Sequence, residues 1–324
     1  PAMDSLDLNT NNVMITRRSF AGFAGASPTI WNSRFSGDHM TWPLALVAEL
    51  AARRCITFLG AGASAGCIAA DGASQPPLWR AFLTKLKSAM PVGTDFTTVD
   101  DLIAKERFLD VAEVILGKMT PADLTRVVRE QFVHPKYNHS RIHEAVLAID
   151  PKIVVTTNYD DIYDSYCRTG MAKDGYNICK YYEDHLVNDL RSPVRLIIKA
   201  HGCVSDPSKI VLSRSQYFRE RQRYGAFYAV LDALFVTNTL LFIGYSLSDP
   251  DIQLLLENAN IAARSSHTHY ALVEDDLQPD IEQAAASAYN LHFIKYPKGC
   301  HDKAEELLLA LADQVTQFRV SNPS

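Results

Sequence analysis

The chain has 324 residues, of which 47% are hydrophobic, so it can bury the core of one large domain or two small ones. Its 32 basic and 37 acidic side chains give a formal net charge of −5, which does not support a protein dedicated to nucleic acid or to membrane surfaces. No apolar run approaches the roughly 20 residues of a membrane span. None of the six cysteines forms a C-x-x-C pair, so we expect reduced thiols in a cytoplasmic protein, without a zinc site or a disulfide framework.

Residues 1–39 are rich in Asn, Ser, Thr and Gly, and we expect an N-terminal extension that is poorly ordered or docks on a partner. Within it, Thr16-Arg17-Arg18-Ser19-Phe20 resembles a twin-arginine export signal. The stretch that follows is only weakly apolar, whereas a signal peptide needs a longer apolar segment and a small-residue cleavage site. We therefore favour the extension over the export signal.

From residue 40 to residue 324 helical patterns alternate with short apolar runs. Thr41-Trp42-Pro43 opens a helix, because Thr can cap it and Pro fits its first turn. Another helix runs from Pro76 to about Ala89, and residues 100–149 are helical throughout. We interpret residues 78–150 as a helical module inserted into a sheet or packed beside it.

Six apolar runs predict the strands of that sheet, at residues 55–59, 152–156, 195–199, 239–243, 268–273 and 291–295. Further helices are expected near residues 160–168, 214–236, 249–263, 277–288 and 302–318. Nearly continuous apolar strands that alternate with helices are typical of a parallel sheet covered on both faces. The sequence therefore predicts an α/β, Rossmann-like fold with an additional helical module.

Three of the predicted strands end in small polar residues or glycine. Strand 55–59 runs into Gly60-Ala61-Gly62-Ala63-Ser64, strand 152–156 into Thr157-Asn158-Tyr159-Asp160, and strand 195–199 into Ala200-His201-Gly202. Ligands of open α/β sheets lie beyond the carboxyl ends of the strands, so we expect these three ends to form one site.

The glycine loop that starts at Gly60 is typical of a phosphate-binding turn, because glycines allow close backbone approach and N–H groups hold the charge. The alternative is an ordinary tight turn. Dehydrogenases also have an acidic residue about 20 positions further on, at the end of a second strand. Here that region, residues 80–87, is predicted to be helical, so a dinucleotide fits but hydride transfer is not favoured.

Polar residues at the other strand ends have both functional and structural interpretations. The Asn158 amide can bind a ribose hydroxyl or a water molecule, or it can simply form a turn before a helix that Asp160 or Asp161 caps. A neutral His201 can act as a general base, or it can be a structural histidine bonded to backbone. Gly244 and Ser246 can contact phosphate or ribose, although capping of the next helix alone would explain that loop.

The glycine loop, the Asn158 strand end, the His201 strand end and the Gly244 loop follow one another in an order that resembles the sirtuin-like family, over roughly residues 44–275. The motifs are Gly60-Ala61-Gly62, Thr156-Thr157-Asn158-Tyr159-Asp160, His201-Gly202 and Gly244-Tyr245-Ser246. Protein-deacetylating sirtuins carry two C-x-x-C pairs after the His-Gly, but here only Cys203 lies between His201 and Cys300. The chain is more similar to the zinc-lacking bacterial sirtuin-like proteins of antiphage defence, a branch known for hydrolysing NAD.

This resemblance implies that residues 40–324 form an NAD-binding catalytic domain, an NAD+ glycohydrolase that gives nicotinamide and ADP-ribose and acts by NAD depletion. It makes Asn158 and His201 the catalytic pair, with NAD as substrate and no metal. The implied NAD-binding residues are Gly60, Ala61, Gly62, Ser64, Thr157, Asp160, Gly244, Tyr245 and Ser246.

Three other interpretations stay open. The chain can be an NAD- or ADP-ribose-sensing subunit of a defence complex, or an NAD-dependent protein deacylase, although the missing cysteine pairs count against the latter. It can also be a subunit that is active only in assembly, with a ring-forming HerA-type ATPase as a candidate partner. We further expect a homo-oligomer that does not contact membranes and meets nucleic acid only through a partner.

Overall fold

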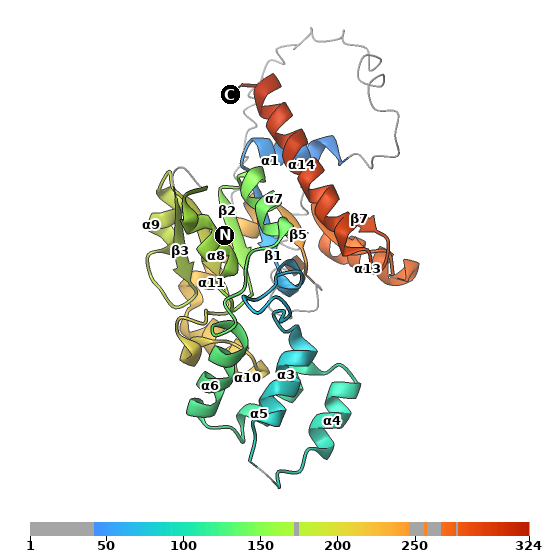
Figure 1. Ribbon diagram of the computed structural model, residues 1–324. Coiled ribbons are helices and arrows are strands. Elements are labelled where there is room, and N and C mark those ends of the chain that lie inside the picture. The colour runs from blue at the N-terminus through green and yellow to red at the C-terminus, as the bar shows by residue number, and fades with distance from the viewer. Residues whose placement is uncertain are drawn as a thin grey trace, which may run out of the picture. The chain divides into compact units, whose positions relative to one another are not determined.

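The computed structural model describes residues 42–323, apart from residues 92, 172–174, 246–255, 258–266 and 277. Within these residues the chain forms a seven-stranded sheet in the order β3-β4-β2-β1-β5-β6-β7 (Figure 1). All neighbouring strands are parallel. The strands are β1 (Cys55–Leu59), β2 (Ile153–Thr156), β3 (Tyr176–Lys180), β4 (Arg195–Lys199), β5 (Thr239–Ile243), β6 (His269–Glu274) and β7 (Leu291–Tyr296).

The helices surround this sheet and extend from it. They are α1 (Leu44–Ala51), α2 (Ala61–Ser64), α3 (Trp79–Ser88), α4 (Thr97–Ala104), α5 (Phe108–Leu116), α6 (Pro121–Phe132), α7 (Arg141–Ile149), α8 (Ile162–Tyr166), α9 (Leu186–Arg191), α10 (Arg214–Arg223), α11 (Gly225–Thr237), α13 (Pro279–Tyr289) and α14 (His301–Ser321). A π-helix, η1 (Cys167–Met171), and a 3₁₀ helix, η2 (Pro207–Lys209), complete the described elements.

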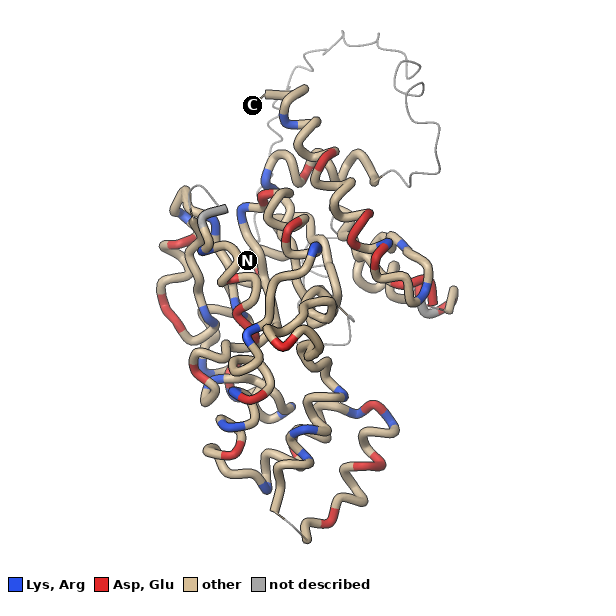
Figure 2. Tube along the Cα trace, viewed as in Figure 1, with Lys and Arg blue, Asp and Glu red and all other residues tan. Residues whose placement is uncertain are grey.

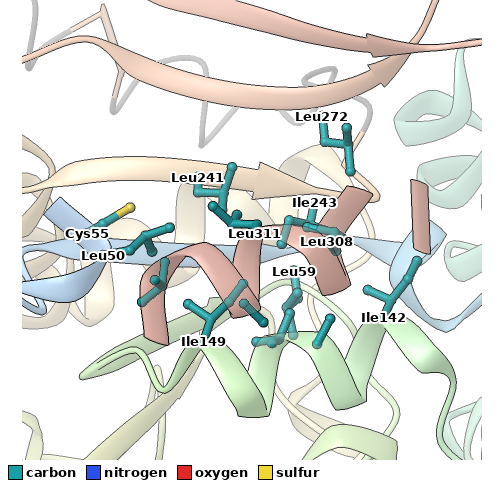
Figure 3. Packing of buried hydrophobic residues seen from close by; sticks show 14 of the residues in the cluster. Leu50, Cys55, Leu59, Ile142, Ile149, Leu241, Ile243, Leu272, Leu308 and Leu311 are labelled. Carbon is teal, nitrogen blue, oxygen red and sulfur yellow. The ribbon is translucent and has the colours of Figure 1, made fainter. Parts of the chain in front are cut away.

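Each face of the sheet has its own hydrophobic core, because side chains alternate along a strand. On β1, Cys55 and Leu59 point to one face, and Phe58 points to the other. Figure 3 shows the first core, where residues of α1, α7 and α14 meet β1 and β5. The second core packs α11 residues such as Leu231 and Phe235 on the opposite face. The predicted α/β fold with a parallel sheet covered on both faces is therefore confirmed.

Helices α3, α5 and α6 pack around a third core with side chains such as Phe82, Val111 and Val128. This core also includes Val204 and Leu212 from the segment that follows β4. The helical module is thus attached to the loops at the carboxyl edge of the sheet. Helix α7 belongs instead to the first core, on a face of the sheet.

One strand was missing from the sequence prediction. β3 lies at the edge of the sheet and pairs only with β4 among the described strands. Its sequence, Tyr-Asn-Ile-Cys-Lys, is only partly buried, and it lacks the continuous apolar pattern of the inner strands. The predicted extension over residues 1–39, and all but Leu256 and Glu257 of the predicted helix 249–263, lie outside the described residues. Among the described helices, none is long and apolar enough to cross a membrane.

Candidate functional site

The strand order of the sheet reverses at its centre, between β1 and β5. From β1 the chain builds β2, β3 and β4 on one side and then crosses to β5 on the other side. Ligands of such sheets bind outside the carboxyl ends of the strands at this switch point. The loops that follow β1 and β5 meet there, and the ends of β2 and β4 are adjacent to them.

The loops after β1 and β5 are packed backbone to backbone. The Gly60 N–H donates to the Ile243 carbonyl at 3.0 Å, and the Gly62 N–H donates to the Gly244 carbonyl at 2.8 Å. A Cβ atom on Gly60 would lie 2.3 Å from the Gly244 oxygen, and one on Gly62 would lie 2.8 Å from the Gly244 Cα. Gly244 itself has a φ of 62°, which favours glycine. These three glycines are therefore required by the mutual approach of the two loops, a reason that the sequence analysis did not consider.

Asn158 is fixed against the glycine loop by its donor group. Its Nδ2 donates to the Gly60 carbonyl at 2.9 Å and lies 3.4 Å from the Ser64 hydroxyl. Its backbone N–H donates to Thr156 Oγ1, which in turn donates to the Leu59 carbonyl. No hydrogen bond to Asn158 Oδ1 is found among the described residues, and the side chain is half-buried. The amide can therefore offer an acceptor to a ligand while its donor end holds the loop.

Asp160 connects the same loop to the start of α8. Its Oδ2 accepts from the Ser64 hydroxyl at 3.2 Å, and its Oδ1 accepts from the Ile162 N–H at 3.1 Å. Burial raises the pKa of Asp160, and the nearby Lys199 ammonium opposes this rise. The carboxylate thus orients Ser64 and accepts from the first N–H of α8, one residue before the N-cap Asp161.

Lys199, the last residue of β4, contacts both Asp160 and the following helix α8. Its side chain is 1% exposed, and its ammonium forms an ion pair with Asp164 at 3.1 Å. The same ammonium donates to the Asp160 carbonyl. Burial alone would lower the pKa of Lys199, but the Asp164 carboxylate and other neighbours raise it. This role of Lys199 was not predicted from the sequence, because an ion pair across 35 residues leaves no local pattern.

His201 lies on the strand next to Asn158. β2 and β4 pair in register with Thr156 opposite Lys199, and the Ala200 N–H continues the ladder to the Thr156 carbonyl at 2.9 Å. Asn158 and His201 each follow that pair by two residues, so the structure brings both to the same edge of the sheet. The His201 side chain is buried, with its Nδ1 3.4 Å from the Tyr217 hydroxyl and the two rings edge to face.

The remaining predicted residues have different surroundings. Ala61 is exposed at the start of α2, and Thr157 is half-buried directly after β2. The Tyr245 ring packs edge-on against Phe58 with centroids 5.2 Å apart, so it belongs to the second core as well as to its loop. Ser246 lies outside the described residues.

One contact that holds the glycine loop in place, between Ser140 and Ala63, was not predicted from the sequence. The Ser140 hydroxyl donates to the Ala63 carbonyl at 3.0 Å, and Ser140 forms a capping box with His143 at the start of α7. Burial lowers the pKa of His143 to about 3, so the imidazole is neutral. The capping pattern of Ser140 was readable from sequence, but its contact with a loop 77 residues away was not.

The comparison with known proteins covers the part of the chain that contains Asn158 and His201. A family model described as a SIR2-like domain matches residues 152–294. Defense-associated sirtuin 2 of Bacillus subtilis is 32% identical over 118 residues, which cover 36% of this chain and 11% of that protein.

Two relatives align over a longer part of the chain. NAD(+) hydrolase ThsA of Acinetobacter baumannii (strain 532279) is 24% identical over 250 residues, which cover 76% of this chain and 48% of that protein. The protein of the same name from Bacillus cereus (strain MSX-D12) is 22% identical over 202 residues, covering 60% and 40%. The chain therefore spans less than half the length of these relatives.

Proposed function

We propose that the chain, whose residues 152–294 match a SIR2-like domain, hydrolyses NAD to nicotinamide and ADP-ribose. The observation that carries the proposal is the position of Asn158, whose amide is held by the glycine loop with its oxygen left for a ligand. Relatives named NAD(+) hydrolase and defense-associated sirtuin support NAD as the substrate and NAD depletion in antiphage defence as the role.

The proposed reaction breaks the bond between nicotinamide and ribose C1′. Nicotinamide leaves as a neutral ring, so positive charge builds on the sugar, and the protein has to position, desolvate and stabilise that centre. We assign Asn158 Oδ1 to a ribose hydroxyl or to the attacking water. We assign His201 to accept a proton from the ribose or the water, with no metal taking part.

The pyrophosphate is assigned to the loops that meet at the switch point. The residues are those of the sequence analysis, Gly60, Ala61, Gly62, Ser64, Gly244, Tyr245 and Ser246, with Thr157 beside them. We assign Asp160 a positioning role, because both of its carboxylate oxygens are occupied by Ser64 and the backbone of Ile162.

The test is to incubate the purified chain with NAD and to quantify nicotinamide, ADP-ribose and cyclic ADP-ribose by chromatography. We expect Asn158→Ala and His201→Ala to lower nicotinamide release about 100- to 10,000-fold, the usual effect of losing a general base or its equivalent. Asn188→Ala and His134→Ala change exposed residues outside the site and serve as matched controls. Full turnover in both site variants would refute the assignment.

A second candidate function is NAD or ADP-ribose sensing without turnover. The burial of His201 beside Tyr217 favours it, because an enclosed histidine also fits a purely structural role. In that case the chain would bind NAD in a calorimeter, and Asn158→Ala would abolish binding, but no nicotinamide would form.

We include assembly in the proposal, as a homo-oligomer in the cytoplasm or with a ring-forming HerA-type ATPase. NADase activity that appears only when the partner is added would support this requirement. Full activity of the isolated monomer would contradict it.

A further inference from the structure

A group of potential metal ligands lies at the end of the edge strand β3. Cys179 is on the strand, and Glu183 and His185 are in the turn that leads to α9. The Cys179 thiol, a Glu183 carboxylate oxygen and a His185 ring nitrogen all lie within 4.8 Å of one another. Cys179 is fully buried, whereas the Glu183 and His185 side chains are 26% and 42% exposed. The sulfur ligand is thus buried, whereas the carboxylate and imidazole ligands are accessible to solvent.

The His185 ring is held in one orientation by a carboxylate. Its Nδ1 lies 2.6 Å from Asp189 Oδ2, and Asp189 Oδ1 accepts a hydrogen bond from Asn177 at 3.0 Å. This leaves Nε2 facing Glu183 Oε2 at 3.3 Å. Histidines that bind metals almost always donate their other ring N–H to such a carboxylate, which fixes the tautomer and the ring.

We propose that Cys179 Sγ, Glu183 Oε2 and His185 Nε2 bind one zinc ion, with water in the fourth position. A mixed set of sulfur, nitrogen and oxygen suits zinc, which accepts all three in tetrahedral sites. Tetrahedral bonds of normal length separate ligand atoms by about 3.4 Å. The pair of Glu183 and His185 already has this spacing at 3.3 Å, and Cys179 Sγ lies within 4.8 Å of both.

Lys180 is the main group that competes with the ion. Its ammonium lies 3.0 Å from Glu183 Oε1, and its backbone N–H donates to Oε2 at 2.8 Å. Each carboxylate oxygen has two lone pairs, so Oε2 can bind a metal while it keeps the backbone contact. The positive charge of Lys180 reduces the affinity, so Lys180→Met should bind zinc more tightly than the unaltered chain.

Zinc binding would crosslink the edge strand to the turn before α9. Zinc binds the thiolate form of cysteine, so binding must release the Cys179 thiol proton. Affinity should therefore fall as the pH is lowered, because protons compete for both the thiolate and the imidazole.

The experiment uses the full chain, purified without a histidine tag and dialysed against a chelator. Zinc titration in competition with a chromophoric chelator should give about one equivalent per chain. Cobalt added in place of zinc should give a thiolate-to-cobalt absorption band. We expect Cys179→Ser to abolish that band and His185→Ala to abolish binding. Asp189→Asn should weaken zinc affinity roughly 10- to 100-fold, because only the support of His185 changes.

Cys300→Ser is the matched control, since Cys300 is a partly exposed thiol in a different part of the fold. If a variant is unstable, thermal unfolding of the unaltered chain with and without zinc gives a second measurement, because an ion bound to the folded state must raise the midpoint. Less than about a tenth of an equivalent of bound zinc would overturn the proposal. The contacts of Glu183 and His185 would then be ion pairs only. Binding that Cys300→Ser removes and Cys179→Ser retains would also overturn it. Neither result bears on NAD cleavage.

Discussion

Burial sets the charge of two histidines that hold neighbouring elements together. His143 supports the start of α7 through Ser140, and His269 accepts a hydrogen bond from the Leu240 N–H through its Nδ1 at 3.2 Å. Burial lowers the pKa of His143 from 6.5 to about 3 and that of His269 from 6.5 to about 4. Both imidazoles are therefore neutral in the folded chain at neutral pH.

This predicts a loss of stability in mild acid. Because the folded pKa values are below the unfolded value, the unfolded chain binds more protons, and stability falls as the pH drops below 6.5 toward the folded values. Each histidine should cost about 1.4 kcal/mol between about pH 7.5 and 5.5. Urea unfolding at both pH values measures this.

Variants distinguish the contribution of these two histidines to the pH dependence of stability from that of the carboxylates. His143→Gln and His269→Gln should each remove one share of the pH dependence, whereas His134→Gln at an exposed site should not. An unchanged pH slope in the two buried-site variants would contradict the prediction, even if their overall stability were lower.

The start of α2 packs on the loop after β5, which gives a prediction about two nearby glycines, Gly62 within α2 and Gly66 just after it. A Cβ at position 62 would lie 2.8 Å from the Gly244 Cα, whereas one at position 66 would meet nothing closer than Glu305 Oε1 at 3.7 Å. Gly62→Ala should therefore push the loops apart, lower the free energy of unfolding by about 1–3 kcal/mol and weaken NAD binding. Gly66→Ala, two residues after the end of α2, should change neither.

Urea unfolding and NAD calorimetry on both variants check this. Equal stability and equal NAD affinity in Gly62→Ala and Gly66→Ala would mean that the contact between the two loops is not required.

The strands show which parts of the fold are predictable from sequence. β1 and β5 are fully buried, so their continuous apolar patterns identified them. β3 was missed because an edge strand with Tyr176, Asn177 and Lys180 shares its composition with loops. For the site, the positions of Asn158 and the glycine loop at the ends of predicted parallel strands indicated that they meet, because parallel strands end at one edge of the sheet. The contacts of Asp160 with Ser64 and of Ser140 with Ala63 follow from packing across long sequence separations, which leaves no periodic signal.

Charge is distributed evenly over the molecule. Figure 2 shows Lys and Arg interspersed with Asp and Glu along the described chain, in keeping with the small net charge.

The last helix joins distant parts of the chain. α14 packs against α1 and α7 over the first core, where Figure 3 shows its Leu308 and Leu311. These two side chains and Val315 are fully buried. The Trp42 indole donates to the Leu307 carbonyl at 2.8 Å, so Trp42 reports on the docking of α14. Trp79 packs against the third core and reports on the helical module. These two tryptophans can therefore tell whether the sheet and the module unfold together.

We predict that they do, because the third core is built partly from Val204 and Leu212, which belong to the loop after β4. Leu311→Ala removes a fully buried side chain and should cost about 2–5 kcal/mol, whereas Leu309→Ala, at a partly buried position on the same helix, should cost less than half of that. Urea unfolding is followed by fluorescence in two backgrounds, each of which retains only Trp42 or only Trp79. If unfolding is cooperative, Leu311→Ala shifts both transitions by the same free energy. A shift seen by Trp42 alone would instead mean that the helical module is an independent folding unit, and that the loops it shares with the sheet do not couple the two.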